Sequence, residues 1–440
     1  IRLMYRTDRI RIDERHELFA YLDDFAHKAK CLHNASLFRI RNTFTAHSKK
    51  ALTSNETEVQ NELALLNGQK TYYVLGYGVL QRLMRVTSNP DFFSGLPMQT
   101  AQHIIRQSCS DFKAWLAALK AYREDASSFT GKPKMPGYCK GEATTYLFTN
   151  QDAVIKDGIL KLPKTKVRIP VRRRHGARLM EVKVKPVSGG YELLLVYDVK
   201  EPCVQGGSHS AAIDFGVDNT MAVVSDTGDS LIFKGRNIKS INQYFNKQKA
   251  ERVSLMSKGK QTIGRVWSKY LDHLSAYRTN YIRDCFHKMS RILLEWCKEH
   301  EIGTLVLGSN TFWKQDANMG KQNNQSFVSI PFDMLKSMIE LKACEYGITV
   351  TKTEESYTSK ASFLDNDEIP VYKAGDHQKY SFSGKRIKRG LYRSAEGILI
   401  NADLNGAANI LRKAGYDTSS VQLSRLLNPK IIRFADLNSK

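Results

Sequence analysis

The segment AAIDFGVDNTMAVVSDTG, residues 211–228, decides the fold because it reads as two apolar strands joined by a tight turn. The next stretch, SLIFKG at 230–235, reads as a third strand. One acid, Asp214, stands inside the first strand, where an uncompensated carboxylate costs free energy. Such an acid is either a turn former or a ligand, and the rest of the chain decides between the two.

A pair of glutamates ends another predicted strand. The sequence continues with a buried strand at 302–310 and a helix at about 331–346. The strand GITVTKTEESYTS then ends at Glu354 and Glu355. Because side chains alternate along a strand, these two carboxylates point to opposite faces, and only one of them can face Asp214.

A third acid begins a helix. In INADLNGAANILRKAG, residues 400–415, Asp403 stands at the helix start, and the alanines that follow permit close packing. Three antiparallel strands followed by parallel strands with crossover helices is the RNase H-like α/β plan. In that plan the first strand, a later strand and the final helix bring their carboxylates together. Clustered carboxylates repel one another unless a hard cation such as Mg²⁺, or Mn²⁺, lies between them. Asp214 is therefore predicted to be a metal ligand.

Glu355 is the preferred partner of Asp214. It is the last acid before SYTS, where a turn brings it toward both aspartates. Glu354 is the alternative, and the glutamate that faces away is expected to form a salt bridge with one of the many basic residues.

The charge of the chain predicts a polyanionic partner. Its 440 residues are 42% hydrophobic and carry a formal net charge of +23, with a pI of about 9.6. An excess of this size is typical of nucleic-acid binding. Basic runs lie at 166–178, 234–260 and 383–393. The residues predicted to contact nucleic acid are Arg172, Arg173, Arg174, Lys385, Arg386, Lys388 and Arg389.

The cysteines exclude a disulfide framework and a zinc ribbon. There are seven of them, widely spaced, with no C-x-x-C pair. A reducing, intracellular compartment is expected. Since no run approaches about 18 apolar residues, membrane insertion is not expected.

The hydrophobic period divides the chain into an α+β, multidomain arrangement. Residues 1–12 alternate like a strand, and residues 13–128 are helical. Short strands and turns at 129–203 suggest a small antiparallel barrel, which strand 1–12 is a candidate to complete. Residues 211–440 alternate strands with helices.

The motifs together resemble the TnpB family, the transposon-encoded relatives of type V CRISPR effectors. Three segments resemble the RuvC motifs of that family, and two upstream segments resemble its N-terminal half. The RuvC-like segments are 211–224, 305–365 and 400–411, and the upstream ones are 96–119 and 129–138.

The resemblance implies an RNA-guided DNA endonuclease. The implied architecture is a wedge β-barrel (1–12 and 129–203), interrupted by a helical recognition domain (13–128) and followed by a RuvC nuclease domain (211–440). The implied partners are a guide RNA from the transposon end and a double-stranded DNA target beside a short motif. Two Mg²⁺ ions bridged by Asp214, with Glu355 and Asp403 each holding one, would activate water without a side-chain nucleophile.

Two departures from the family pattern concern the site. Most members carry the middle glutamate where this chain has Gly308, although a subset resembling the eukaryotic Fanzor relatives carries it on the next strand. Most members also have a zinc ribbon. Here residues 361–400 have no cysteine and are expected to form a zinc-free insert.

Other functions compete with this interpretation. One is a nuclease-inactive RNA-guided DNA-binding protein, which the survival of Asp214, a strand-end glutamate and Asp403 disfavours. An ATPase of the same core would need a D-x-G-G-G phosphate motif, which is absent. A DNA-joining transposase would not need the guide-binding N-terminal half. The expected location is the cytoplasm in a bacterium or the nucleus in a eukaryote.

Overall fold

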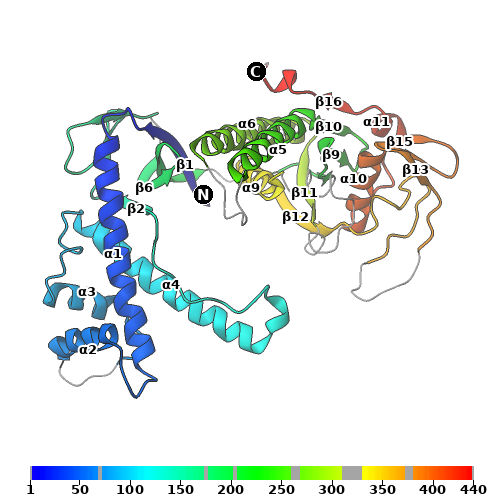
Figure 1. Ribbon diagram of the computed structural model, residues 1–440. Helices are drawn as coiled ribbons and strands as arrows, with labels where there is room; N and C mark the ends of the chain where they lie inside the picture. The colour runs from blue at the N-terminus through cyan, green and yellow to red at the C-terminus, as the bar shows by residue number, and fades with distance from the viewer. Residues whose placement is uncertain are drawn as a thin grey trace. The chain divides into compact units, whose positions relative to one another are not determined.

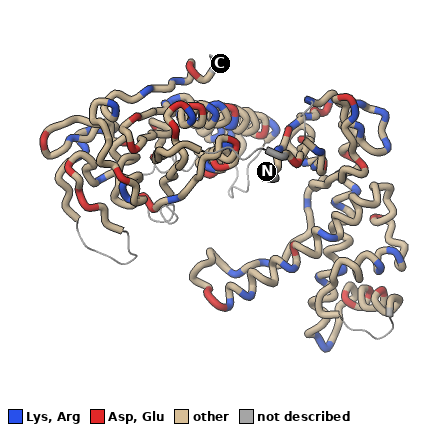
Figure 2. Tube along the Cα trace, turned by 180° about the vertical axis from the view of Figure 1, so that it is seen from behind, with Lys and Arg blue, Asp and Glu red and all other residues tan. Residues whose placement is uncertain are grey.

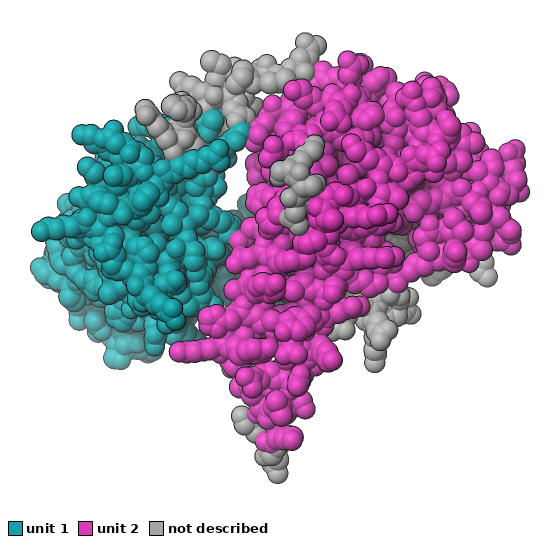
Figure 3. Space-filling model, turned by 90° about the horizontal axis from the view of Figure 1, so that it is seen from above, with its two compact units in different colours: residues 1–201 teal, residues 202–440 magenta. Residues whose placement is uncertain are grey.

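The computed structural model describes residues 2–67, 72–172, 177–201, 206–258, 268–309, 330–371 and 380–438. The chain forms two compact units, residues 1–201 and residues 202–440 (Figure 3). Each unit is described by itself.

The first unit contains two antiparallel sheets. Strand β1 (Arg2–Asp13) pairs with β7 (Gly190–Glu201), and the sheet continues through β6 (Ala177–Val187) to β2 (Tyr146–Thr149) (Figure 1). The N-terminal strand therefore joins the later strands, as expected. A smaller sheet contains β3 (Val154–Lys156), β4 (Ile159–Lys161) and β5 (Arg168–Pro170). No pairing among the described strands closes these sheets into a barrel, so the predicted barrel is not confirmed.

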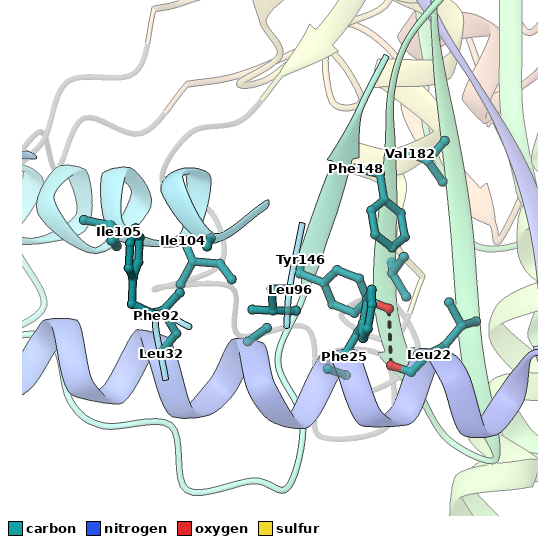
Figure 4. Packing of buried hydrophobic residues seen from close by; sticks show 14 of the residues in the cluster. Leu22, Phe25, Leu32, Phe92, Leu96, Ile104, Ile105, Tyr146, Phe148 and Val182 are labelled. Carbon is teal, nitrogen blue, oxygen red and sulfur yellow. Dashed lines mark hydrogen bonds between the residues drawn. The ribbon is translucent and has the colours of Figure 1, made fainter. Parts of the chain in front are cut away.

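Helices fill the segment predicted to be helical. They are α1 (Phe19–Ala46), α2 (Ser54–Asn67), α3 (Tyr77–Val86), α4 (Met98–Glu124) and the short η1 (Ala126–Ser128). Their apolar stripes pack against one another and against β2 and β6 in one core (Figure 4). Within it, the Tyr146 hydroxyl donates a hydrogen bond to the Leu22 carbonyl at 3.2 Å, which ties β2 to α1.

The second unit is built on a six-stranded mixed sheet in the order β12-β11-β8-β9-β10-β16. Its strands are β8 (His209–Asp214), β9 (Asn219–Ser225), β10 (Ser230–Lys234), β11 (Ile302–Ser309), β12 (Thr349–Glu354) and β16 (Lys430–Ile432). Strands β8, β9 and β10 are antiparallel neighbours, whereas β11 and β12 run parallel to β8. This is the sequence of antiparallel and then parallel strands predicted from the hydrophobic pattern.

Helices cover both faces of this sheet. On one face lie α6 (Lys269–Glu299) and α9 (Phe332–Ala343), in a core with Ile213, Leu305 and Leu307. On the other lies α10 (Ala402–Lys413), whose small and apolar residues pack on Ala212, Val306 and neighbouring strand residues. The remaining elements are α5 (Arg236–Ser257), η2 (Cys344–Tyr346), α11 (Leu423–Leu427) and η3 (Ala435–Asn438).

The insert before α10 contains a small antiparallel sheet of its own. It is formed by β13 (Lys385–Lys388), β14 (Leu391–Arg393) and β15 (Leu399–Asn401). Strand β15 leads directly into α10, so this sheet is joined to the helix that carries Asp403.

Candidate functional site

Three acids from distant parts of the sequence approach one another on the α10 face of the sheet. Asp214 ends β8, Glu355 follows β12, and Asp403 lies in the first turn of α10. Strand alternation explains the shared face, because Ala212, two residues before Asp214, packs on α10 while Ile213 packs on the opposite side. All three acids are partly buried.

Two glycines allow the acids to come close. A Cβ atom on Gly406 of α10 would lie 2.7 Å from Asp214 Oδ2, so the carboxylate lies directly against the helix backbone. A Cβ atom on Gly308, at the end of β11, would collide with Glu355 Oε2 and lie 2.9 Å from Ile410 Cδ1. Glu355 therefore occupies the space that a side chain at position 308 would need.

The electrostatics of the site reflect this crowding. Burial, followed by the charges of Glu355 and Asp403, raises the pKa of Asp214 well above its usual range, against the opposing charge of Arg386. Burial also raises the pKa of Glu355, which the Lys336 ammonium opposes. An added cation would relieve the repulsion between these carboxylates.

Glu354 has a different environment from its neighbour. Its carboxylate forms an ion pair of 2.5 Å with Lys413 of α10 and accepts a hydrogen bond of 2.7 Å from the Ser356 amide. These hydrogen bonds lower the pKa of Glu354 although burial acts to raise it. A basic partner was expected for the glutamate that faces away from Asp214, and Glu354 has one.

Lys336 of α9 reaches the site from the other side. Its Nζ donates a hydrogen bond to the Gly308 carbonyl at 2.6 Å and lies 4.8 Å from the centre of the Phe215 ring. Burial lowers the pKa of Lys336, while the charges of Glu355, Asp333 and Asp214 act to raise it. It places a positive charge beside the ends of β8 and β11.

Asp403 is held by three neighbours. The side chain of Asn401 caps α10 by accepting hydrogen bonds from the Asp403 and Leu404 amides, which fixes the helix start. The Asp403 carboxylate accepts a hydrogen bond of 2.6 Å from Asn219 on one oxygen, and Arg386 lies 3.5 Å from the other.

The donors suit a hard divalent cation, because carboxylate oxygens are its preferred ligands. Among the described residues, however, no group of three or more His, Cys, Asp or Glu side chains is arranged to hold a metal ion as it stands. Two contacts, with Asn219 and Arg386, engage the Asp403 carboxylate in this arrangement.

A cavity of about 1000 Å³ opens beside Asp403. Its cationic lining residues are Lys234, Arg236, Lys239, Arg386 and Arg389. Asp218 draws two of them together, because it pairs with Lys239 at 2.8 Å and with Arg389 at 2.5 Å. The cavity is therefore rich in phosphate-binding side chains next to the acidic cluster.

The predicted nucleic-acid contacts are only partly brought together. Arg386 and Arg389 line the cavity, whereas Lys385 and Lys388 are exposed on β13. Arg172 is exposed in the first unit, and Arg173 and Arg174 lie outside the described residues. Lysines and arginines occur on both units (Figure 2).

Sequence reasoning missed several residues of the site. The basic run that begins at Lys234 signalled the cavity lining, but it did not single out Arg236 or Lys239. Asn219 was visible only as a polar residue at a strand start. Nothing in the sequence identified Lys336, because its contacts depend on how α9 packs against Phe215.

Two family models match the chain. Residues 194–313 match OrfB_IS605, described as a probable transposase, and residues 332–410 match the Cas12f1-like TNB domain. The first segment contains Asp214, and the second contains Glu355 and Asp403.

Similar proteins agree with these matches. The TnpB-like protein ORF457 of Acidianus two-tailed virus is 32% identical over 215 residues, which are 47% of this chain and 42% of that protein. The match therefore spans less than half the length of this curated relative. Together with the family models, it bears out the resemblance to the TnpB family that the motifs predicted.

Solved structures also match. A chain of the Cas12f1–sgRNA–target DNA complex has a TM-score of 0.48 and 15% identity, covering 90% of this chain and 82% of that one. The mini-RNA-guided endonuclease CRISPR-Cas_phi3 has a TM-score of 0.44 and 8% identity, covering 94% of this chain and 93% of that one.

No described helix combines the length and apolar character needed to cross a membrane.

Proposed function

We propose that the chain is an RNA-guided DNA endonuclease with an RNase H-like, RuvC-type site formed by Asp214, Glu355 and Asp403. The observation that carries the proposal is the convergence of these acids beside a cavity lined by cations. The relationship to the TnpB family supports it. Its partners would be a guide RNA from the transposon end and a double-stranded DNA target beside a short recognition motif.

The acids would hold Mg²⁺ or Mn²⁺. When bound, the metal would supply an activated water and stabilise the charge that develops on the phosphate. The charges of both Glu355 and Asp403 act on Asp214 and help to raise its pKa. Asp214 would therefore be the ligand shared between the metal ions. For Asp403 to serve as a ligand, Arg386 must release its oxygen, which the long contact and the half-exposed side chain of Arg386 allow.

The cations would bind the backbone of the strand to be cut. Arg236, Lys239 and Arg389 line the cavity that borders Asp403 and would pair with phosphates, while Arg386 lies between the cavity and the acids. Contacts to phosphates do not distinguish one base from another, so sequence recognition would come from base pairing with the guide RNA.

The alternative function is guided DNA binding without cleavage. The same cationic cavity would serve it, but simple binding does not require a buried Asp214 carboxylate with the charges of Glu355 and Asp403 beside it. The acidic cluster therefore favours the nuclease.

The test starts from the protein expressed beside its native locus. RNA that copurifies is sequenced, and the complex is then given a plasmid library carrying the matching target next to randomised flanks. We expect a discrete RNA, cutting that requires Mg²⁺ or Mn²⁺, and enrichment of a short flanking motif among the cut plasmids.

The matched control is Asp214→Asn, which keeps shape and removes charge. It is expected to bind guide and target like the parent and to lose cutting by several orders of magnitude. Target binding without cutting by the parent would favour the alternative function, and absence of a discrete RNA would exclude both. The same preparation is expected to contain no stoichiometric zinc on elemental analysis.

A further inference from the structure

We propose that Asn219 is a positioning residue that determines which oxygen of Asp403 is presented to the metal. This inference rests on the proposed function. Asn219 begins β9, is 5% exposed, and donates from Nδ2 to Asp403 Oδ2 at 2.6 Å. A hydrogen bond to an ionised carboxylate is stronger than one between neutral groups, so it restrains rotation of the acid.

Lys234 fixes the direction of this amide. It lies opposite Asn219 in the antiparallel pair of β10 and β9, and its Nζ donates to Asn219 Oδ1 at 3.0 Å. An ammonium can only donate and a carboxylate can only accept. The amide is therefore oriented by both neighbours, with its oxygen toward Lys234 and its nitrogen toward Asp403.

The two oxygens of Asp403 are consequently different. Oδ2 is bound by a buried amide that is itself held by Lys234. Among the side chains that the structure describes, Oδ1 meets Arg386 at 3.5 Å, and 46% of the Arg386 side chain is exposed. Because the weaker and more exposed contact is the easier one to replace, Oδ1 is the oxygen available to a metal.

The test compares Asn219→Asp with Asn219→Ala. If Asn219 mainly fills space, the alanine variant, which leaves a void, should be worse than the isosteric N219D variant, whose added charge lies beside the Lys234 ammonium. If Asn219 acts through its donated hydrogen bond, the order reverses, because a carboxylate cannot donate to Asp403 and repels it. We expect guided cutting at saturating target to slow about tenfold in N219A and about a hundredfold in N219D. Guide binding should stay unchanged, and the saturating target offsets any loss of target binding from the altered cavity wall.

A second readout needs no activity. Thermal unfolding of the metal-free protein is compared for the parent, N219D, D403N and the double variant N219D/D403N. N219D is expected to lower the unfolding temperature, and D403N should remove that loss, because the repulsion requires both carboxylates. Gln243→Glu, which adds a charge to the wall of the same cavity, should slow cutting less than N219D does.

Lys234→Met tests the second link. Because Lys234 also lines the cationic cavity, cutting is compared at saturating target, where its loss in Lys234→Met is expected to shrink in the N219A background if Lys234 acts through Asn219. Fully additive losses would contradict that link. Cutting by N219D at least as fast as by N219A, or parental unfolding of N219D, would overturn the positioning role. If the parent cuts no guided target, the proposed function fails, and the unfolding comparison alone still decides whether Asn219 holds Asp403.

Discussion

The carboxylates of Glu354 and Glu355 are neighbours in sequence and have different partners. Glu354 is neutralised by Lys413, whereas Glu355 lies against Gly308 beside Asp214. We expect Glu355→Gln to lower guided plasmid cutting by several orders of magnitude, because one metal ligand is lost. Glu354→Gln should change cutting only a few-fold, since it removes an ion pair at the edge of the site.

The measurement is a guided plasmid-cleavage assay with a target-binding control for each variant. Lys413→Met is the matched control for Glu354→Gln, because it breaks the same ion pair from the other side. Full cutting by Glu355→Gln together with loss in Glu354→Gln would reverse the assignment. Full cutting by both variants would show that neither glutamate takes part in the mechanism.

Asp214 predicts a pH-dependent stability. Its pKa is raised in the folded protein, so ionising it costs folding free energy that is fully present above the folded pKa and declines as the pH falls through that value. Asp214→Asn should therefore unfold at a higher temperature than the parent at pH 8 without divalent ions. The difference in unfolding temperature between Asp214→Asn and the parent should become smaller as the pH is lowered. Added Mg²⁺ should also reduce this difference, because it stabilises the parent. A gain that grows as the pH falls would contradict the expectation.

The sequence predicted those residues of the site whose positions follow from the alternation of side chains along a strand. Alternation predicted that only one glutamate faces Asp214. The surplus of basic residues predicted a salt bridge for the other glutamate. The sequence could not predict Asn219 or Lys336, because their partners are set by strand register and by the packing of α9.

Among the elements, α10 does more than carry Asp403. Two of its side chains, Asn405 and Asn409, are fully buried and bind the backbone of the turn that follows Glu355. Asn405 donates to the Ala361 carbonyl and accepts from the Phe363 amide, and Asn409 donates to the Thr358 and Ala361 carbonyls. The helix thus fixes the segment that leads away from Glu355.

Asn409→Ala tests this connection. It would leave the Thr358 carbonyl without its side-chain donor, while the Ala361 carbonyl keeps Asn405, and it is expected to lower the free energy of unfolding by about 2 kcal/mol. Asn428→Ala is the matched control, because Asn428 is exposed and bonds only within its own turn; its effect should stay below about 0.5 kcal/mol. Chemical denaturation, followed by tryptophan fluorescence or circular dichroism, measures the free energy of unfolding of both variants. Equal changes would show that the asparagine contacts add nothing.

The succession of antiparallel and then parallel strands in the second unit was predictable, because β8, β9 and β10 are apolar and joined by short turns and the parallel strands β11 and β12 follow long helical segments. The pairing of β16 with β10 was not predicted. The sheet of β13, β14 and β15 was not predicted, since β13 is fully exposed and basic and β14 and β15 are only three residues long. The barrel expected in the first unit rested on strand content alone, and strand content does not specify closure.

The whole molecule carries a formal net charge of +23, and this predicts how the proposed guide RNA would bind. Log affinity for the guide should fall linearly with log salt concentration, with a slope that counts the phosphates contacted. Replacing Arg172, Arg173 and Arg174 together by glutamate should weaken binding and make the slope shallower. Fluorescence anisotropy across a salt series measures both quantities. Parental affinity and slope in the triple variant would show that this segment does not bind the guide.

The space shared by position 308 and the Glu355 carboxylate has an evolutionary consequence. A side chain at 308 and the Glu355 carboxylate in its observed position would compete for the same space, so one of them would have to move. A lineage that exchanged one arrangement for the other is therefore expected to have changed the two positions together. In a comparison of related sequences, positions 308 and 355 should therefore be read as a pair, because the end of β11 alone does not show whether the site has its third acid.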